Sequence, residues 1–238
     1  MSRKKESNLV RQAYEGLKKA IICMRYLPGE NLLEEELEQA LNVSRTPIRI
    51  ALSKLEHEGL VTHRPGRGYL VREIRLKDVR DLFQVREYLE VPATRLAAEN
   101  AAKEELADLR DFWARTHEAL ERSDFEGYLN GAVEFHYRIA MMSRNDVLCE
   151  LIKSLNERLS IVSRILLRSE RRLARSHQEH KGILDRIVDR DADAAAEAAR
   201  RHVIESQEEF LDLLRSRTEL LAVSPLPGFE RGARIQKA

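Results

Sequence analysis

Apolar residues recur at helical spacing along most of this chain. From about residue 8 to residue 26 they return every three or four positions, and a second, shorter run covers residues 33–41. A third run begins after Ser44, which is a good N-cap, and stops before Gly59, a residue type common at helix C-termini. Two short β-prone runs within residues 60–73 flank a Pro-Gly-Arg-Gly turn and predict a single hairpin.

Beyond this hairpin the helical pattern continues almost unbroken from about Lys77 to about Arg217. The first helix there is expected to run from Leu76 to about Asn100, with a kink at Pro92. Helices joined by short connections favour an antiparallel bundle. The predicted inward positions of the first helix are Leu82, Val85, Leu89 and Ala93, and further helices are expected to begin near Lys103, Asp124, Asn145, Glu170 and Asp191.

The predicted fold is therefore mainly α, in two domains and a tail. Residues 1–75 are expected to form a winged helix-turn-helix domain of three helices and a small β-hairpin wing. Residues 76–217 are expected to form an antiparallel all-α bundle of about six helices, and residues 218–238 a tail. The first 75 residues hold 14 Lys and Arg against 10 Asp and Glu, whereas the remainder hold 27 against 30. The small part is thus the basic one, as a nucleic-acid-binding domain would be.

Composition excludes several classes of protein. The 238 residues are 43% hydrophobic and carry a net charge of +1, which excludes wholesale disorder and a globally basic nucleic-acid coat. Cys23 and Cys149 are far apart and suggest no disulfide framework, so a reducing cytoplasm is the expected location. The basic residues at the N-terminus lead into no apolar signal-peptide region, and no apolar stretch is long enough for a membrane span.

The third predicted helix carries polar residues suited to DNA. Arg45 lies at its N-terminal end, and Thr46, Arg49 and Ser53 lie opposite its buried stripe. A short helix with two arginines near its tip suits the major groove, where arginine can bond guanine O6 and N7 together. Exposed arginines on ordinary helices are the alternative interpretation. The arginine-bearing hairpin that follows favours the wing of a DNA-binding domain, with candidate contacts at Arg64, Gly66, Arg67 and Gly68.

These residues resemble the DNA-binding domain of the GntR family of bacterial transcriptional regulators. The resemblance implies operator contacts from Arg45, Thr46, Arg49 and the wing, and it covers nearly all of residues 8–73. Two positions depart from the family pattern: residues 34–36 are all glutamate where many relatives carry an arginine, and Ile50 replaces a usual glutamate. The motif consists of Leu27-Pro28-Gly29-Glu30, Leu37, Leu41-Asn42-Val43-Ser44-Arg45-Thr46-Pro47-Ile48-Arg49, Ala51-Leu52, Leu55-Glu56, Glu58-Gly59-Leu60-Val61 and Arg67-Gly68-Tyr69-Leu70-Val71.

Four polar residues fall on apolar stripes of the predicted bundle: Arg86, His136, His180 and His202. A lone histidine in such a place is usually a core residue with a satisfied hydrogen bond. Three inward histidines on three helices point instead to a ligand or metal site, because bundle interiors are where such sites form. His177 lies one turn before His180 and could supply a fourth nitrogen or merely flank it.

The second part of the chain resembles the FCD ligand-sensing domain of the FadR subfamily within GntR. The resemblance implies a divalent metal held by one aspartate and three histidines, which here are His136, His180 and His202, and a small carboxylate effector beside it. The position of the aspartate is Ala132, and Glu134 is expected to point away. The matching residues are Val85-Arg86-Glu87, Leu89-Glu90, Ala93, Leu96-Ala97-Ala98, Phe135-His136, Ile139-Ala140, Ser143, Asn145, Glu179-His180, Ile183-Leu184, Asp191, Ala195 and His202.

Two modes of effector binding stay open from the sequence. Three imidazoles could hold Zn²⁺ or Ni²⁺ with water or effector completing the shell. Alternatively, the histidines and Arg86 could bind an anionic effector directly.

The sequence thus favours a homodimeric transcriptional regulator, more specifically a repressor, over an enzyme. It would bind double-stranded, palindromic operator DNA, and a small organic acid would control that binding. No membrane partner is expected. The alternatives are a metal-dependent hydrolase built on the histidines and a winged helix used for protein contacts. Neither a placed general base nor a nucleophile or phosphate-loop motif supports the hydrolase.

Overall fold

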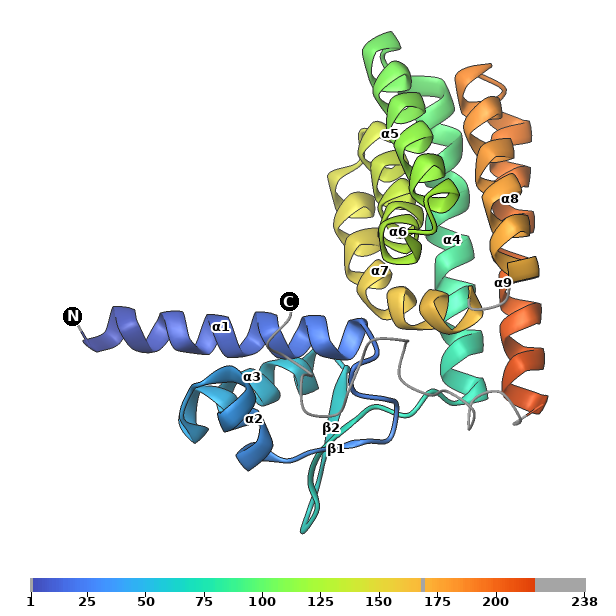
Figure 1. Ribbon diagram of the computed structural model, residues 1–238. Coiled ribbons are helices and arrows are strands. Elements are labelled where there is room, and N and C mark those ends of the chain that lie inside the picture. Colours follow the sequence, from blue (N-terminus) through green and yellow to red (C-terminus); the bar gives the residue numbers. More distant parts are fainter. Residues whose placement is uncertain (1, 168–169, 217–238) are drawn as a thin grey trace. The chain divides into compact units, whose positions relative to one another are not determined.

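The computed structural model describes residues 2–167 and 170–216 (Figure 1). The tail predicted at 218–238 lies outside the described residues. The described residues form two compact units that divide between Ile74 and Arg75.

The N-terminal unit contains three helices, as predicted: α1 (Ser2–Ile22), α2 (Glu34–Leu41) and α3 (Arg45–His57). The prediction that the first helix reaches residue 26 is wrong in its last turn. Met24 adopts a left-handed backbone with φ of 56°, and the amides of Met24 and Arg25 bond the carbonyls of Ile21 and Ala20. These two bonds form a Schellman motif, which ends the helix before the loop at Pro28.

The helix α3 is held by its apolar stripe. Ile48, Ala51, Leu52 and Leu55 are all fully buried, and α3 packs on α1. Ser44 stands at the N-cap with an extended backbone, but its side chain makes no capping hydrogen bond. The opposite side of α3 is left exposed, as the sequence predicts.

The predicted hairpin is present as β2 (Val61–Arg64) and β3 (Gly68–Val71), which pair antiparallel. Gly66 and Gly68 have φ of 75° and 74°, so the turn uses a backbone conformation that suits glycine. A third strand, β1 (Asn31–Leu32), pairs antiparallel with β3 and gives the order β1-β3-β2. The sequence pattern missed β1 because two residues are too few to show an alternation.

The second unit is the predicted antiparallel bundle of six helices, which run side by side in Figure 1. Three of them begin next to residues near which the sequence predicts a start: the side chains of Asp124, Asn145 and Asp191 accept hydrogen bonds from amides in the first turn. No helix of the described residues is long and apolar enough to cross a membrane. The helices are α4 (Leu76–Asn100), α5 (Lys103–Glu121), α6 (Phe125–Met142), α7 (Asp146–Leu166), α8 (Glu170–Val188) and α9 (Ala192–Ser216).

The inward face of α4 differs from the predicted one. Val85 is 47% exposed, and Leu82 and Leu89 are only partly buried, whereas Ala93 is buried as predicted. The buried stripe runs instead through Val79, Phe83, Arg86, Glu90, Ala93, Thr94, Ala97 and Ala98. The prediction followed the most apolar spacing along the helix. In the structure, α4 instead faces α6 and α9 with the charged pair Arg86 and Glu90, and Arg86 bonds a histidine on each of those helices.

Candidate functional site

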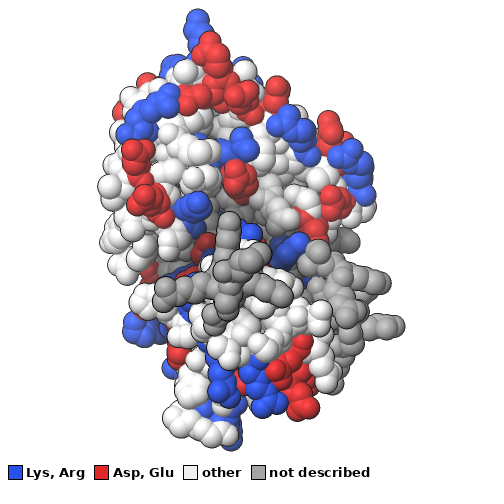
Figure 2. Space-filling model, turned by 90° about the vertical axis from the view of Figure 1, so that its left-hand side faces the viewer, with Lys and Arg blue, Asp and Glu red and all other residues white. Residues whose placement is uncertain are grey.

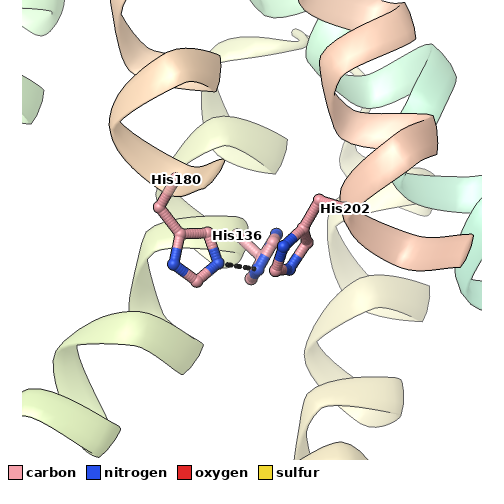
Figure 3. A group of neighbouring side chains, drawn as sticks. All are labelled: His136, His180 and His202. Atoms are coloured by element: carbon pink, nitrogen blue, oxygen red, sulfur yellow. Dashed lines mark hydrogen bonds between the residues drawn. The ribbon is translucent and has the colours of Figure 1, made fainter. Parts of the chain in front are cut away.

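Three histidines from three helices meet inside the bundle. His136 of α6, His180 of α8 and His202 of α9 are all buried, and one ring nitrogen of each lies within 4.8 Å of the others (Figure 3). The Nε2 atoms of His136 and His180 are 3.0 Å apart. A tetrahedral zinc with Zn–N bonds of about 2.0–2.1 Å separates its nitrogen ligands by about 3.3 Å. The three histidines are therefore close enough together to hold a metal ion among them.

Two carboxylates orient two of the imidazole rings. The Nδ1 atom of His202 makes a 2.7 Å hydrogen bond with Glu179, and the Nδ1 atom of His136 lies 3.0 Å from a carboxylate oxygen of Glu90. Both rings therefore hold their Nδ1 proton toward a carboxylate and turn the Nε2 lone pair toward the common centre. Carboxylate partners of this kind orient metal-binding histidines in many proteins. The Nδ1 atom of His180 has no hydrogen-bond partner among the described residues.

Arg86 of α4 reaches the same centre. Its Nη2 atom lies 3.0 Å from the Nε2 atoms of both His136 and His202, and its Nε donates to Glu90 at 2.9 Å. Arg86 is 6% exposed and Glu90 is 3% exposed. A buried ion pair thus sits against the histidines, and the arginine already occupies two of their lone pairs.

Burial sets the protonation states here. Desolvation, together with neighbouring cations, lowers the pKa of His180 and of His202 well below the ordinary value, so both rings are neutral near pH 7. Burial opposes the negative charge of Glu90, but Arg86 and His136 overcome it and lower its pKa. Neutral imidazoles are the form in which histidine binds a metal.

The histidines line one wall of a cavity with a polar and an apolar side. The apolar side comes from Leu159, Val162, Leu166 and Leu167 of the α7 region, together with Phe83 of α4. The free volume is about 30 Å³, which holds a water or two but no larger molecule. Any larger ligand must therefore move side chains as it enters.

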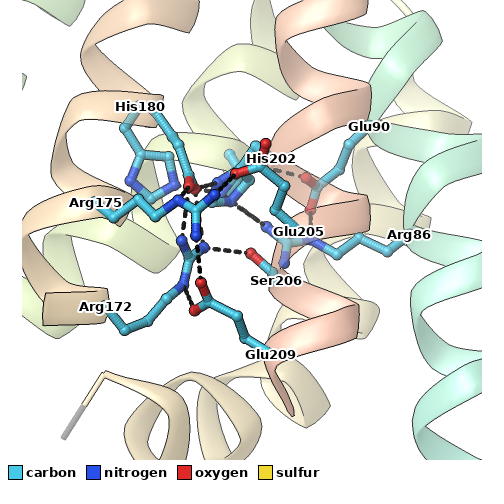
Figure 4. A network of polar contacts seen from close by, with 11 residues as sticks. Arg86, Glu90, Arg172, Arg175, His180, His202, Glu205, Ser206 and Glu209 are labelled. Atoms are coloured by element: carbon cyan, nitrogen blue, oxygen red, sulfur yellow. Dashed lines mark hydrogen bonds and ion pairs between the residues drawn. The ribbon is translucent and has the colours of Figure 1, made fainter. Parts of the chain in front are cut away.

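A second buried arginine lies on the other side of the histidines. Arg172 of α8 bonds both oxygens of Glu179 at 2.7 and 2.9 Å. It also donates a hydrogen bond to the hydroxyl of Ser206 (Figure 4). Its Nε lies 3.1 Å from Glu209 of α9. Glu179 also makes the hydrogen bond to Nδ1 of His202. This network between α8 and α9 therefore fixes the orientation of the His202 ring.

The residues present fit a metal ion with an open coordination position. Three converging ring nitrogens leave a fourth position for water or a ligand atom. Ala132 is buried and lines the cavity one turn before His136, where the resemblance places an aspartate. As expected, Glu134 points elsewhere and pairs with Arg138 at 3.3 Å. His177 is not part of the group, since it stacks on Trp113 and His117.

Sequence reasoning missed Glu90, Glu179 and Arg172 as members of this site. The signal for Glu90 was its place four residues after Arg86, on the same face of α4. Glu179 directly precedes His180, and nothing in the sequence pattern places its carboxylate beside a histidine on another helix. Only the packing of α8 on α9 brings it there.

The N-terminal unit presents the predicted DNA-contacting residues on its surface. Arg45, Thr46, Arg49 and Ser53 are exposed along one side of α3. In the hairpin, Arg64 is partly exposed and lies 3.8 Å from Glu73, while Gly66, Arg67 and Gly68 are exposed at the turn. Figure 2 shows basic and acidic side chains next to each other on this face rather than a patch of one sign.

The charges are mixed because acidic residues of α2 pair with the arginines of α3. Arg49 Nε lies 2.9 Å from Glu34, and Arg45 Nε lies 2.9 Å from Glu38. Hydrogen bonding to these carboxylates raises the pKa of both guanidinium groups, which stay charged.

Comparison with protein families matches both units. Residues 9–71 match the family described as bacterial regulatory proteins, gntR family, and residues 81–205 match the FCD domain. The second match alone covers more than half of the chain. The two matched ranges lie on either side of the division between the two units.

Curated relatives and solved structures agree with these matches. The chain is 35% identical to the Nta operon transcriptional regulator of Aminobacter aminovorans, over 82% of this chain and 90% of that protein. It is 28% identical to the transcriptional repressor RspR of Escherichia coli, over 83% and 86%. The fold is shared with E. coli McbR/YncC, at a TM-score of 0.70 and 24% identity over 88% of this chain and 98% of that one. A transcriptional regulator GntR from Rhodococcus sp. RHA1 has a TM-score of 0.75, at 23% identity over 87% and 98%.

Proposed function

Because this chain belongs to the GntR family of bacterial regulatory proteins and carries an FCD domain, it is a DNA-binding transcriptional regulator, and we propose that a small organic acid bound among its buried histidines controls that binding. The observation that carries this proposal is the convergence of three buried histidines and a buried arginine on one small cavity. Burial of so many polar groups destabilises a protein unless they are paired, so their gathering at one cavity favours a binding site over an ordinary apolar core.

DNA would be bound by α3 and the hairpin. Arg45, Thr46, Arg49 and Ser53 share the exposed side of α3, which is short enough to enter a major groove. At the hairpin turn the backbone can approach phosphate closely, because Gly66 and Gly68 carry no side chain there.

In the cavity, His136, His180 and His202 would hold one divalent metal ion, Zn²⁺ or Ni²⁺. When bound, such an ion supplies a positive centre that attracts the carboxylate of an acid. Arg86 would add a second cationic contact after moving off the two Nε2 atoms that it now bonds. The apolar α7 side of the cavity would receive the carbon part of the acid.

Two copies of the chain would bind a palindromic operator, because a two-fold protein matches a two-fold site. The helices α4 and α7 pack against each other. Both expose apolar side chains, which offer a surface for that pairing: Val85, Tyr88, Val147 and Leu151. As a repressor, the dimer would release DNA if the acid binds the DNA-incompetent arrangement more tightly.

The DNA-binding surface is tested with Arg49→Ala and a matched control, Arg201→Ala. Arg49 is exposed on α3, whereas Arg201 is exposed on α9 of the other unit. The duplex that the wild type recovers from a random-sequence library serves as the probe, and fluorescence anisotropy measures binding. Loss of one bidentate base contact should weaken binding by about fivefold to a hundredfold or more in Arg49→Ala only. Equal binding by the two variants would contradict the proposed contact.

The cavity is tested by metal analysis and a thermal-shift screen of small carboxylic acids on one purified sample. Stoichiometric metal together with acid-induced stabilisation supports the metal-assisted mode. Metal should then be lost in His180→Gln. Stabilisation by an acid without metal supports direct binding by Arg86 and the histidines. A sample that neither holds metal nor responds to any acid rejects this role for the cavity.

A further inference from the structure

The glutamates of α2 and the arginines of α3 form a two-rung ladder. Glu34 and Glu38 are four residues apart and therefore share one face of α2. Arg45 and Arg49 are also four residues apart and share one face of α3. The rungs are Glu34 with Arg49, whose Nε lies 2.9 Å from both carboxylate oxygens, and Glu38 with Arg45 at 2.9 Å.

Each rung leaves the far end of its guanidinium available. The bonds to glutamate use the Nε–H, and within the described residues the Nη atoms of Arg45 and Arg49 make no hydrogen bond. These Nη atoms are the donors that can bond guanine O6 and N7 side by side. The arginines remain 58% and 64% exposed despite their partners.

We infer that Glu34 and Glu38 are positioning residues that set the base selectivity of Arg49 and Arg45. This inference rests on the DNA-binding role proposed above for α3. A free arginine has many rotamers and can reach a phosphate as easily as a base, whereas a guanidinium fixed at Nε can present its Nη pair in few directions. The carboxylates also repel phosphates, so the pairs disfavour sequence-independent contacts.

Stability is not what these pairs provide. Exposed ion pairs contribute little to folding, because solvent screens them and two long side chains lose freedom. Replacing Glu34 or Glu38 with glutamine should therefore leave the melting temperature nearly unchanged while it alters DNA recognition.

The experiment compares Glu34→Gln and Glu38→Gln with Glu35→Gln. Glu35 is exposed on the same helix, and its side chain makes neither a hydrogen bond nor an ion pair among the described residues. All three variants remove one negative charge from α2, so any general gain in attraction to phosphate is shared. Each full-length variant is used to select duplexes from a random-sequence library, and binding to the wild-type motif and to an unrelated duplex is then measured.

The expected result is a loss of selectivity restricted to the paired positions. Glu34→Gln and Glu38→Gln should each lower the ratio of motif to unrelated-duplex affinity about fivefold or more beyond Glu35→Gln, since a misplaced bidentate contact discriminates poorly. In an Arg49→Ala background, Glu34→Gln should cause no further loss of selectivity, because the guanidinium it positions is gone.

Two outcomes overturn the inference. One is a recovered motif and selectivity ratio that are the same in all three glutamine variants. The other is an equal gain in affinity for both duplexes, which would mean that the carboxylates only compete with DNA. If the wild type itself selects no motif, the proposed DNA-binding role fails instead.

Discussion

Arg86 is the residue whose replacement tests the site most directly. It is buried, it bonds Glu90 at 2.9 Å, and its Nη2 contacts two histidines at 3.0 Å. Arg86→Met keeps much of the side-chain volume but removes the charge. The carboxylate of Glu90 then stays buried with only His136 beside it. We expect this variant to be strongly destabilised, and not merely to lose its response to the effector.

The magnitude follows from the burial of the pair. Breaking a buried ion pair by removing one partner costs about 3–5 kcal/mol, because the other charge is left uncompensated. In a protein of this size, 1 kcal/mol shifts the melting temperature by about 2–4 °C. Arg86→Met should therefore lower the melting temperature by about 6–20 °C. Arg86→Met/Glu90→Gln, which removes both charges, should recover most of this loss.

The assay is thermal unfolding followed by circular dichroism, in buffer with chelator so that metal does not contribute. Arg201→Met, at an exposed position of α9, is the matched control and should melt within a degree or two of the wild type. If the single and the double variant are equally unstable, the cost arises from lost packing and the ion-pair reasoning is refuted. A melting temperature that is unchanged in Arg86→Met would refute it as well.

Three further predictions concern the same site. Ala132→Asp places a carboxylate in the cavity one turn before His136, so it should raise the metal affinity measured by isothermal titration. In chelator, the buried carboxylate should lower the melting temperature. An unchanged metal affinity would argue against a metal centre there. Glu179→Gln replaces the carboxylate that bonds His202 Nδ1 with a neutral amide, so it should lower metal affinity about 10–100-fold in the same titration. An affinity equal to that of the wild type would show that this carboxylate does not affect metal binding by His202. Metal-free protein should lose stability below about pH 6.5, by up to about 1.4 kcal/mol per pH unit for each histidine. In this range the unfolded chain binds protons at His180 and His202, whereas the folded protein keeps both buried rings neutral because burial lowers their pKa. Melting temperatures from pH 7.5 to 5.5 check this, and a smaller slope is expected in His180→Gln, whereas an equal slope would contradict it.

Much of the local structure could be predicted from the sequence. The predicted starts of α5 to α9 lie within a residue or two of the observed ones. At three of these starts, Asp124, Asn145 and Asp191 cap the helix, and such a side chain acts within one turn of its own position. The turn between β2 and β3 was likewise visible in its glycines. Where a signal depended on very few residues, as in the strand β1 or the last turn of α1, the pattern was too short to detect.

The sequence by itself also determined which side chains could do chemistry. His136, His180 and His202 are polar residues on apolar stripes, and a helix that buries one face must bury them. Likewise Arg45 and Arg49 had to be exposed, because they lie opposite the apolar stripe of α3.

Only the tertiary structure decided what these side chains meet. Helical periodicity fixes the face on which a residue lies but not the rotation of one helix against its neighbour, and Val85 shows the resulting error. The partners Glu179 with His202 and Glu34 with Arg49 come from different helices. Their pairing depends on side-chain directions and distances of about 3 Å, which packing alone sets.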